Sequence, residues 1–328
     1  MSAGIVVLVE QLKGAVSDVS FEMLGAARAL AGQTGAPVWG VLLGSDSVPL
    51  ASKLGAADKV FVVDNPQLNL APADVAAATL KTLLDQTGAG LVLIGCTNLS
   101  AGIGAILAAK TGLPLVNFCR AVRAEGNALI CTSQLFGGKI LSDVRLPEGR
   151  GVLSIYPGSF PADAGKSDKA PPIEHVTVPG IESHMGRIVF KELIEPAAGD
   201  VDITKQDVLV SVGRGIQTQD NIALAEELAQ ALGGVVSASR PIVDQGWLPM
   251  TRQVGKSGMT VKPKLYLALG ISGAPEHWEG MKDSSLIIAV NTDPKAPIFD
   301  FAHYGATVDC LELIEPLKAA IEKRKAGK

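Results

Sequence analysis

The stretch Val208-Leu-Val-Ser-Val-Gly-Arg-Gly215 sets the character of the second half of this 328-residue chain. Its apolar, valine-rich start predicts a buried strand, and the glycines that follow predict a tight turn. Thr218 or Asp220 is then a plausible cap for an amphipathic helix predicted over 220–232. A strand, a glycine turn and a helix in this order are typical of α/β folds that bind nucleotides beyond the carboxyl ends of their strands.

Arg214 and the two glycines around it are by themselves a weak signal. Thr218 stands where a complete dinucleotide fingerprint would have its third glycine. A strand-to-helix turn with positive φ would explain the glycines equally well. If the turn faces a ligand, the amides at the helix start and the Arg214 guanidinium would suit a pyrophosphate.

The same half of the chain repeats apolar runs that end in glycine or polar residues. We predict further strands at 234–237, 265–269, 285–290 and 306–310, and a last helix at 315–325. Residues that follow predicted strands include Gly213, Arg240, Gly270–His277 and Asn291. Because ligands of such sheets bind at that edge, we expect these residues to line one site. The segment from Arg240 to Pro263 has little periodicity, which indicates a binding loop.

The first half of the chain also alternates strand and helix. Apolar runs at 5–9, 38–43, 59–63 and 91–95 predict buried parallel strands. Helices are predicted between and after them, at 20–31, 47–54, 74–84 and 102–110. This order predicts a parallel sheet with helices on both faces. From residue 114 to about 160, turn residues separate the apolar runs, including 152–156, and predict appended antiparallel strands.

Residues 161 to about 206 are rich in proline, glycine, alanine and charge, with one strand-like run at 175–178. The stretch from Glu192 to Asp202 has little to bury, and we place the domain boundary there. The sequence therefore predicts an α/β protein of two domains, each with a mainly parallel sheet and helices on both faces. Residues 1–203 form the first, and residues 204–328 form a doubly wound second domain.

The composition argues against several classes of protein. Apolar residues make up 47% of the chain, as in globular proteins, and a formal net charge of -4 gives no basis for binding nucleic acid. Cys96, Cys119, Cys131 and Cys310 form no CxxC pair, so we expect buried thiols in a reducing compartment and no metal site. No apolar run has the length of a membrane span, and the first strand begins too early for a leader peptide. We expect a cytoplasmic protein without direct membrane insertion.

Three candidate motifs of the second half have ordinary explanations beside functional ones. Gln253–Gly258 contains Gly-Lys-Ser but lacks the earlier glycine of a P-loop. Arg240 would serve a ligand or pair with Asp244, and the sequence leaves both open. His277 would serve the site or occupy a turn. No Ser-His-Asp set, paired carboxylates or histidine cluster has catalytic spacing, so hydrolysis has no support.

Eight short motifs occur in order over about 100 residues: Gly213–Gly215, Ser239–Trp247, Gln253–Gly258, Gly270–Ala274, His277, Gly280–Asp283, Val290–Phe299 and Tyr304–Gly305. In this order they closely resemble the electron transfer flavoprotein alpha subunit. The first 200 residues agree with that family in architecture. Within them, Phe136–Gly138 and Tyr156–Phe160 are similar to its hairpin region.

The resemblance implies an FAD carried by the second domain and completed by a separate beta subunit. By position, Arg214 and Ser239 would contact the phosphate and ribityl region, and Arg240 would lie over the isoalloxazine. The flavin edge would be lined by Val254, Gly255, Lys256 and Ser257, with the Ser257 hydroxyl near N5. The flavin and ribityl chain would be wrapped by Ser272, Gly273, Ala274, Pro275, Glu276 and His277, with His277 near the C2 carbonyl. The adenosine end would be held by Asn291, Asp309 and Cys310.

Charge beside the flavin is the property that these residues would control. Arginine suits the ring face because it keeps its proton and stacks on planar rings, and a fixed cation there would favour the anionic form of the flavin semiquinone. Three residues depart from the family's usual pattern. Lys256 stands where a glutamine is usual, and Pro275 and Glu276 replace an aliphatic residue and a glutamine before His277. We therefore hypothesise a shifted flavin potential, without predicting its sign.

The resemblance implies a redox carrier, with no catalytic residue of its own, rather than an enzyme. It would take electrons from flavin dehydrogenases, such as the acyl-CoA dehydrogenases of fatty acid β-oxidation, and pass them to a quinone-linked oxidoreductase. An electron-bifurcating version that uses NADH through the beta subunit stays open. So does a stand-alone NAD- or FAD-dependent oxidoreductase with His277 or His303 as acid or base, and a nucleotide-sensing module without redox chemistry. The long proline-rich segment near 161–200 predicts a partner interface.

Overall fold

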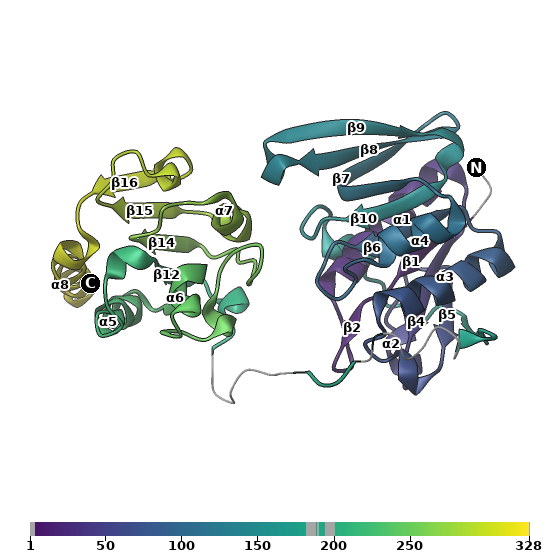
Figure 1. Cartoon of the computed structure of the whole chain (residues 1–328), viewed down its shortest axis with the longest axis horizontal. Coiled ribbons are helices and arrows are strands. Elements are labelled where there is room, and N and C mark those ends of the chain that lie inside the picture. Colours follow the sequence, from purple (N-terminus) through teal and green to yellow (C-terminus); the bar gives the residue numbers. More distant parts are fainter. Residues whose placement is uncertain (1–3, 182–187, 189, 194–200, 328) are drawn as a thin grey trace. The chain divides into compact units, whose positions relative to one another are not determined.

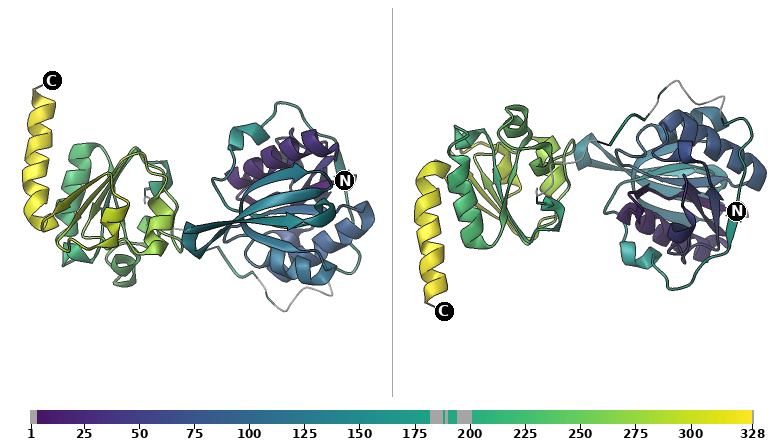
Figure 2. Two further views of the ribbon diagram at one scale, coloured as in Figure 1. Left: turned by 90° about the horizontal axis from the view of Figure 1, so that it is seen from above. Right: turned by 90° about the horizontal axis from the view of Figure 1, so that it is seen from below.

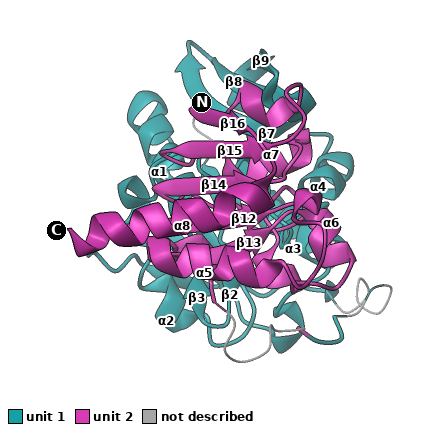
Figure 3. Cartoon of the chain, turned by 90° about the vertical axis from the view of Figure 1, so that its left-hand side faces the viewer, with its two compact units in different colours: residues 1–192 teal, residues 193–328 magenta. Residues whose placement is uncertain are grey.

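The computed structural model describes residues 4–181, 188, 190–193 and 201–327. The chain divides into two compact units, Met1–Glu192 and Leu193–Lys328, which Figure 3 shows in two colours. The predicted α/β class and the organisation in two parts are confirmed. Residues 194–200, within the stretch in which we place the domain boundary, lie outside the described residues. A boundary at residues 203 and 204 therefore remains a prediction.

One large sheet carries the first unit. In chain order its strands are β1 (Ile5–Leu8), β4 (Val38–Leu43), β5 (Lys59–Val63), β6 (Leu91–Gly95), β7 (Leu115–Glu125), β8 (Ala128–Leu135), β9 (Ile140–Leu146), β10 (Gly151–Ile155) and β11 (Ile173–His175). Their order in space is β11-β5-β4-β1-β6-β10-β7-β8-β9 (Figure 1). Neighbours from β11 to β7 are parallel, and β8 and β9 extend the sheet by antiparallel pairing. A separate hairpin pairs β2 (Gln11–Leu12) with β3 (Ala15–Val16).

Helices cover both faces of this sheet, as the alternation of strands and helices predicts. Helix α1 (Asp18–Thr34) packs on one face, and α3 (Ala73–Thr87) and α4 (Ile103–Thr111) pack on the other (Figure 2). Leu93 of β6 joins the core under α1, and its neighbour Val92 joins the core under α3 and α4. Successive residues of a strand thus serve opposite faces. The helix predicted at 47–54 is shorter, because α2 spans only Val48–Ala51.

The expectation of antiparallel pairing for 152–156 is wrong. Strand β10 lies between β6 and β7 and runs parallel to both. All of its residues are buried, as in central parallel strands, whose apolar runs do not alternate with polar residues. Turn residues before the strand suggest a hairpin locally, whereas the chain in fact crosses over to another place in the sheet. The strand-like run at 175–178 is likewise displaced, because β11 ends at His175.

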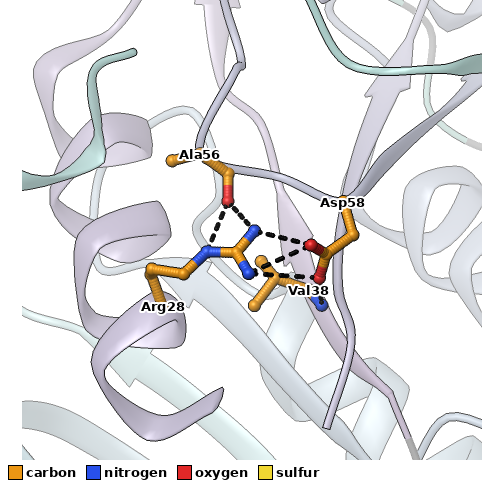
Figure 4. A network of polar contacts seen from close by, with 4 residues as sticks. All are labelled: Arg28, Val38, Ala56 and Asp58. Atoms are coloured by element: carbon orange, nitrogen blue, oxygen red, sulfur yellow. Dashed lines mark hydrogen bonds and ion pairs between the residues drawn. The ribbon is translucent and has the colours of Figure 1, made fainter. Parts of the chain in front are cut away.

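A polar cluster ties α1 to the neighbouring strands of the first unit (Figure 4). Arg28 Nε donates to the Ala56 carbonyl oxygen at 2.9 Å, and its two terminal nitrogens each lie 3.0 Å from Asp58 Oδ1. Asp58 Oδ2 accepts the Val38 N–H at 2.8 Å. Burial opposes ionisation of Asp58, but the hydrogen bonds from Val38 and Arg28 outweigh it and lower the pKa of this carboxyl. The cluster therefore joins a helix and a strand that are distant in the sequence.

A parallel sheet of five strands carries the second unit. The strands are β12 (Val208–Val212), β13 (Val235–Ala238), β14 (Leu265–Leu269), β15 (Ile287–Asn291) and β16 (Tyr304–Thr307). Their order is β13-β12-β14-β15-β16, so the direction of winding reverses beside β12. One face packs against α5 (Ile222–Leu232) and α8 (Cys310–Ala326), and the other against α7 (Pro275–Met281). This is the predicted doubly wound arrangement, with its ligand crevice expected between β12 and β14.

Several local predictions in the second unit are wrong. Helix α8 begins at Cys310 and continues through Pro316. The periodic pattern of the sequence predicted that this helix begins at residue 315. Proline within the second turn hides the true start of such a helix. Neither Thr218 nor Asp220 caps α5, because the N-cap is Asn221, whose Nδ2 donates to the Ile216 carbonyl oxygen at 2.9 Å. The segment read as a loop after residue 239 begins with the one-turn helix α6 (Arg240–Asp244).

Short 3-10 turns connect these elements, at Pro66–Leu68, Phe136–Gly138, Pro147–Gly149, Ala162–Gly165, Ile203–Lys205, Arg214–Ile216, Met250–Arg252 and Pro297–Asp300. Among the described residues, no helix has both the length and the apolar character needed to cross a membrane. Cys119, Cys131 and Cys310 are buried thiols, as expected, whereas Cys96 is partly exposed.

Candidate functional site

A cavity of about 460 Å³ lies at the carboxyl edge of the second sheet. It is placed where the strand order reverses, the position at which doubly wound sheets bind ligands, and its size is that of an ordinary ligand pocket. The structure brings together there most of the residues predicted for the site: Arg214, Ser239, Arg240, Val254, Gly255, Lys256, Ser257, Ser272, Ala274, Glu276, His277 and Asn291.

The glycine turn after β12 packs directly against the glycine turn after β14. Gly213 N–H donates to the Leu269 carbonyl oxygen at 2.9 Å, and Gly215 N–H donates to the Gly270 carbonyl oxygen at 3.1 Å. A Cβ on Gly215 would lie 2.5 Å from Gly270 Cα, which is too close for any side chain. The glycines are thus required for contact between two backbone turns. That contact places Arg214 beside the residues that follow β14.

Arg240 combines the two alternatives that the sequence leaves open. Its Nε lies 3.3 Å from Asp244 Oδ2, one helical turn further along α6, and both residues also line the cavity. The Arg240 side chain is 68% exposed, so the ion pair contributes little to stability. The guanidinium remains accessible to a ligand in the cavity.

The Gly-Lys-Ser loop forms another wall of the cavity. The buried Gln253 donates from Nε2 to Ser257 Oγ at 3.1 Å, which leaves the Ser257 hydroxyl hydrogen available to a ligand. Gly255 has a φ of 142°, and a Cβ there would lie 2.9 Å from the Glu276 carbonyl oxygen. Lys256 N–H donates to that same oxygen at 2.7 Å. These contacts hold the loop against the first turn of α7.

His277 belongs to α7 rather than to a turn, and it is 7% exposed. Its Nε2 lies 2.9 Å from the hydroxyl oxygen of Tyr266, which is buried on β14. Burial lowers the pKa of His277 to about 4, although the Val254 backbone acts in the opposite direction. The imidazole is therefore neutral at neutral pH. It offers the cavity a polar group without a charge.

A second cavity of about 440 Å³ adjoins the first, and Arg214, Gly270 and Asn291 line both. Asp309 and Cys310, which the family resemblance assigns to adenosine, line the second cavity. The two cavities therefore form one continuous row along the carboxyl edge of the sheet.

The residues of this second cavity also hold its walls in place. Asp309 caps α8 by accepting the Leu311 N–H at 2.9 Å, and its other oxygen accepts Gln217 Nε2 at 3.1 Å. Cys310 Sγ donates to the Gly215 carbonyl oxygen at 3.4 Å. Burial raises the pKa of Cys310 to about 11, so the thiol stays neutral. Helix α8 is thereby joined to the glycine turn after β12.

Gly273 and Pro275 are the predicted site residues that line neither cavity. Gly273 has a φ of 85°, and a Cβ there would lie 2.3 Å from the Ile298 backbone nitrogen. Pro275 occupies the first turn of α7, where its missing N–H costs no hydrogen bond. Both residues shape the turn that leads into α7.

The prediction from sequence missed several residues that line the cavities. Asp244 lies four positions after Arg240, a helical spacing that identifies it once α6 is recognised. Gln253 begins the Gly-Lys-Ser loop and is buried, like its predicted neighbour Val254. Gln217 and Thr292 line the second cavity, and no sequence signal marks them.

The two cavities together suit a long ligand with an anionic group near its middle. The first is lined by three cationic residues, Arg214, Arg240 and Lys256, and by two carboxylates, Asp244 and Glu276. Arg214 also lines the second cavity, so a cation stands where the two meet. A diphosphate there would meet the Arg214 guanidinium. The residues present thus fit a flavin dinucleotide.

Two families of protein domains match the sequence of this chain. Residues 202–282 match the electron transfer flavoprotein FAD-binding domain, so the second unit is an FAD-binding domain. Residues 5–180 match the electron transfer flavoprotein domain. The chain belongs to the electron transfer flavoprotein family and is an alpha subunit of it.

Relatives align with this chain over nearly its whole length. The electron transfer flavoprotein subunit alpha of Megasphaera elsdenii is 36% identical to this chain, and the aligned region covers 98% of this chain and 97% of that protein. The acryloyl-CoA reductase electron transfer subunit beta of Anaerotignum propionicum is 35% identical, over 97% of this chain and 95% of its own. The lactate dehydrogenase (NAD(+),ferredoxin) subunit LctC of Acetobacterium woodii is 32% identical, over 97% of this chain and 77% of its own. The resemblance therefore extends to the first half.

Proposed function

We propose that this chain carries FAD in its second unit and passes electrons one at a time between partner flavoproteins. The observation that carries the proposal is the cavity where the strand order reverses, which collects the residues that the resemblance assigns to FAD. Bound FAD supplies reversible one-electron and two-electron chemistry. The chain's own residues hold the cofactor and set the charge and hydrogen bonding around it.

In this proposal the first cavity receives the flavin end. Arg240 provides a cation at the ring, and Asp244 moderates its charge through their ion pair. Ser257 offers a hydroxyl hydrogen toward the ring, because Gln253 already occupies an acceptor site on its oxygen. His277 offers a neutral imidazole.

The other proposed contacts follow the row of cavities. Arg214 and Ser239 bind the phosphate and ribityl region. The remaining flavin and ribityl contacts come from Val254, Gly255, Lys256, Ser272, Ala274 and Glu276, with Gly273 and Pro275 shaping the turn. The second cavity receives the adenosine, between Asn291, Asp309 and Cys310. Arg214 stands at the junction and serves the diphosphate.

A carrier agrees with the chemistry of these cavities better than a stand-alone oxidoreductase does. An oxidoreductase acting on an organic substrate needs an acid or base with a pKa near the working pH. His277 is held neutral by its low pKa of about 4. His303 lines neither cavity, and its Nδ1 accepts the Ile287 N–H at 3.0 Å. Neither histidine is suited to that role.

We further propose that a beta subunit completes the site in a cytoplasmic heterodimer. Its donors are flavin dehydrogenases, such as acyl-CoA dehydrogenases in fatty acid β-oxidation, and its acceptor is a quinone-linked oxidoreductase. Gel filtration of the alpha chain alone and of the co-expressed pair tests the partner. We expect FAD to remain with the pair and to be lost from the alpha chain alone. A lone alpha chain that keeps stoichiometric FAD would contradict the heterodimer.

Electron bifurcation is the second candidate function. It is favoured by the similarity to a relative named for NAD(+) and ferredoxin. The assay is oxidation of NADH by the heterodimer with a low-potential acceptor, with and without an acyl-CoA dehydrogenase and an enoyl-CoA, which together form the second electron acceptor. Reduction of the low-potential acceptor that depends on the second one would establish bifurcation. If the heterodimer does not oxidise NADH, bifurcation is refuted and the one-electron carrier remains the proposed function.

An anaerobic reductive titration of the heterodimer tests the carrier proposal, with visible absorbance recorded throughout. We expect reduction in two resolved one-electron steps. A single concerted two-electron bleaching would overturn the proposal in favour of hydride chemistry. Absence of any flavin absorbance from the folded heterodimer would overturn FAD binding itself.

A further inference from the structure

Tyr266 is a fully buried residue of β14, in the middle of the second sheet. It lines neither cavity, yet its hydroxyl oxygen lies 2.9 Å from Nε2 of His277, which lines the first. The ring centroids are 6.1 Å apart and the rings are tilted by 59°. The two residues therefore meet through their polar atoms and not through stacking.

A hydroxyl at this position costs stability unless it has a partner, and phenylalanine would fill the same core without that cost. Ser211 of β12 and Ser237 of β13, which pair in register, are also fully buried. Burial raises the pKa of Tyr266, and the two serine hydroxyls act on it in the opposite direction. Neither serine makes a hydrogen bond of normal geometry to any described residue. Three buried hydroxyls thus gather behind one cavity residue, His277.

We propose that Tyr266 is a positioning residue of the FAD site, whose hydroxyl donates to Nε2 of His277 and so fixes the imidazole plane and keeps its proton on Nδ1. The consequence for FAD rests on the function proposed above. The contact between the two side chains does not.

The direction of this hydrogen bond follows from the surroundings of the imidazole. A neutral imidazole has one N–H and one acceptor nitrogen, so the group facing either nitrogen decides the tautomer. His277 Nδ1 is buried and makes no hydrogen bond of normal geometry to a described residue, whereas Nε2 faces the Tyr266 hydroxyl, and the Val254 backbone acts on the ring in the sense that favours a bound proton. With the proton on Nδ1, Nε2 is an acceptor and the Tyr266 hydroxyl is its donor. Without that hydroxyl, the ring is free to change tautomer and to rotate.

Nitrogen NMR of the heterodimer, labelled with 15N-histidine, tests the contact directly. The His277 signals are assigned from their loss in His277→Asn. We expect a protonated Nδ1 and an unprotonated Nε2 in the parent protein, and a mixed or reversed tautomer in Tyr266→Phe. The matched control is Tyr304→Phe, which removes the hydroxyl of a tyrosine that is 68% exposed on β16 and should change nothing. A proton on Nε2 in the parent, or no change in Tyr266→Phe, would overturn the proposal.

A double-mutant cycle on FAD retention tests whether Tyr266 acts through His277. Loss of one buried hydrogen bond predicts roughly threefold to tenfold weaker FAD binding in Tyr266→Phe. The same change in a His277→Asn background should have no further effect. An equal loss in both backgrounds would show a merely structural role and overturn the proposal. If Tyr266→Phe does not fold, 3-fluorotyrosine at the same position keeps the shape and strengthens the donor. The Nε2 signal must then shift, and an unshifted signal would refute the bond.

The two proposals fail separately. A heterodimer without FAD would refute the proposed function, whereas the NMR experiment would still report the tautomer of His277. A heterodimer with FAD but an unchanged tautomer in Tyr266→Phe would refute only the role of Tyr266.

Discussion

Removing the charge of Arg240 is expected to lower the first one-electron potential of bound FAD, and removing that of Asp244 is expected to raise it. The two side chains form an ion pair of 3.3 Å and both line the cavity that we assign to the flavin. Arg240→Gln removes a cation that favours electron uptake, and Asp244→Asn removes the anion that moderates it. Shifts of opposite sign from adjacent residues would separate an electrostatic effect from general damage to the site.

The magnitude follows from Coulomb's law and the exposure of the pair. A unit charge ~4 Å away is worth about 4 kcal/mol at an effective dielectric of ~20, and about 1 kcal/mol in water. The Arg240 and Asp244 side chains are 68% and 60% exposed, so the lower part of that range applies. About 1 to 2 kcal/mol corresponds to about 40 to 90 mV, at ~59 mV and ~1.36 kcal/mol per tenfold change for one electron.

Spectroelectrochemical titration of the heterodimer at low and high salt measures both shifts. The salt dependence is informative because screening weakens the effect of exposed charges. Arg324→Gln is the matched control, since Arg324 is exposed on α8 and lines neither cavity. Shifts of the same sign in Arg240→Gln and Asp244→Asn would refute the reasoning. A shift in Arg240→Gln no larger than that of the control would refute it as well.

Three further substitutions test the packing. Gly255→Ala should release FAD and destabilise the second unit by about 1 to 3 kcal/mol. The reason is that Gly255 has a φ of 142° and that a Cβ there would lie 2.9 Å from the Glu276 carbonyl oxygen. Unchanged flavin content and an unchanged Tm would contradict this. Gly32→Ala, in open space on α1, should stabilise the first unit by about 0.5 to 1 kcal/mol, and a lowered Tm would count against it. Asp58→Ala should cost about 1 kcal/mol at neutral pH because the Val38 N–H loses its acceptor. Since the pKa of Asp58 is lowered in the folded state, this contribution is complete above its unfolded pKa of ~4 and is lost as the pH falls through the folded value. Urea denaturation at several pH values should therefore show the variant and the parent converging in acid, and a constant difference would refute this.

Much of the fold was predictable because buried parallel strands are marked by local composition. The strand 208–212 is observed with the predicted bounds, and so is 265–269. Both are short, apolar and followed by glycine, so a window of a few residues contains the whole signal. Helix bounds were less accurate at α8, because Pro316 interrupts the periodic pattern without ending the helix.

The place of a strand in its sheet was not predictable in the same way. The run 151–155 has the composition of a parallel strand, but turn residues before it suggested a hairpin. Pairing with β6 and β7 depends on a crossover and on the burial of both faces. Neither property is contained in the residues of the strand itself.

The candidate site likewise has properties that the sequence predicts and properties that depend on the fold. Family resemblance named most residues of the first cavity, including Arg240 and His277. The ion pair of Arg240 with Asp244 was one of two alternatives that the sequence left open, and the one-turn helix α6 brings the two side chains together. Family resemblance did not give the low pKa of His277, which is a consequence of burial.

The sequence by itself determined the α/β class, the nucleotide-binding character of the second half and, through the family resemblance, FAD as its cofactor. These properties are carried by short motifs whose meaning does not depend on distant residues. Only the tertiary structure decided that Gly215 and Gly270 pack backbone to backbone and that Tyr266 meets His277. Such contacts join different strands and helices. They depend on the order of strands in the sheet, which no local pattern specifies.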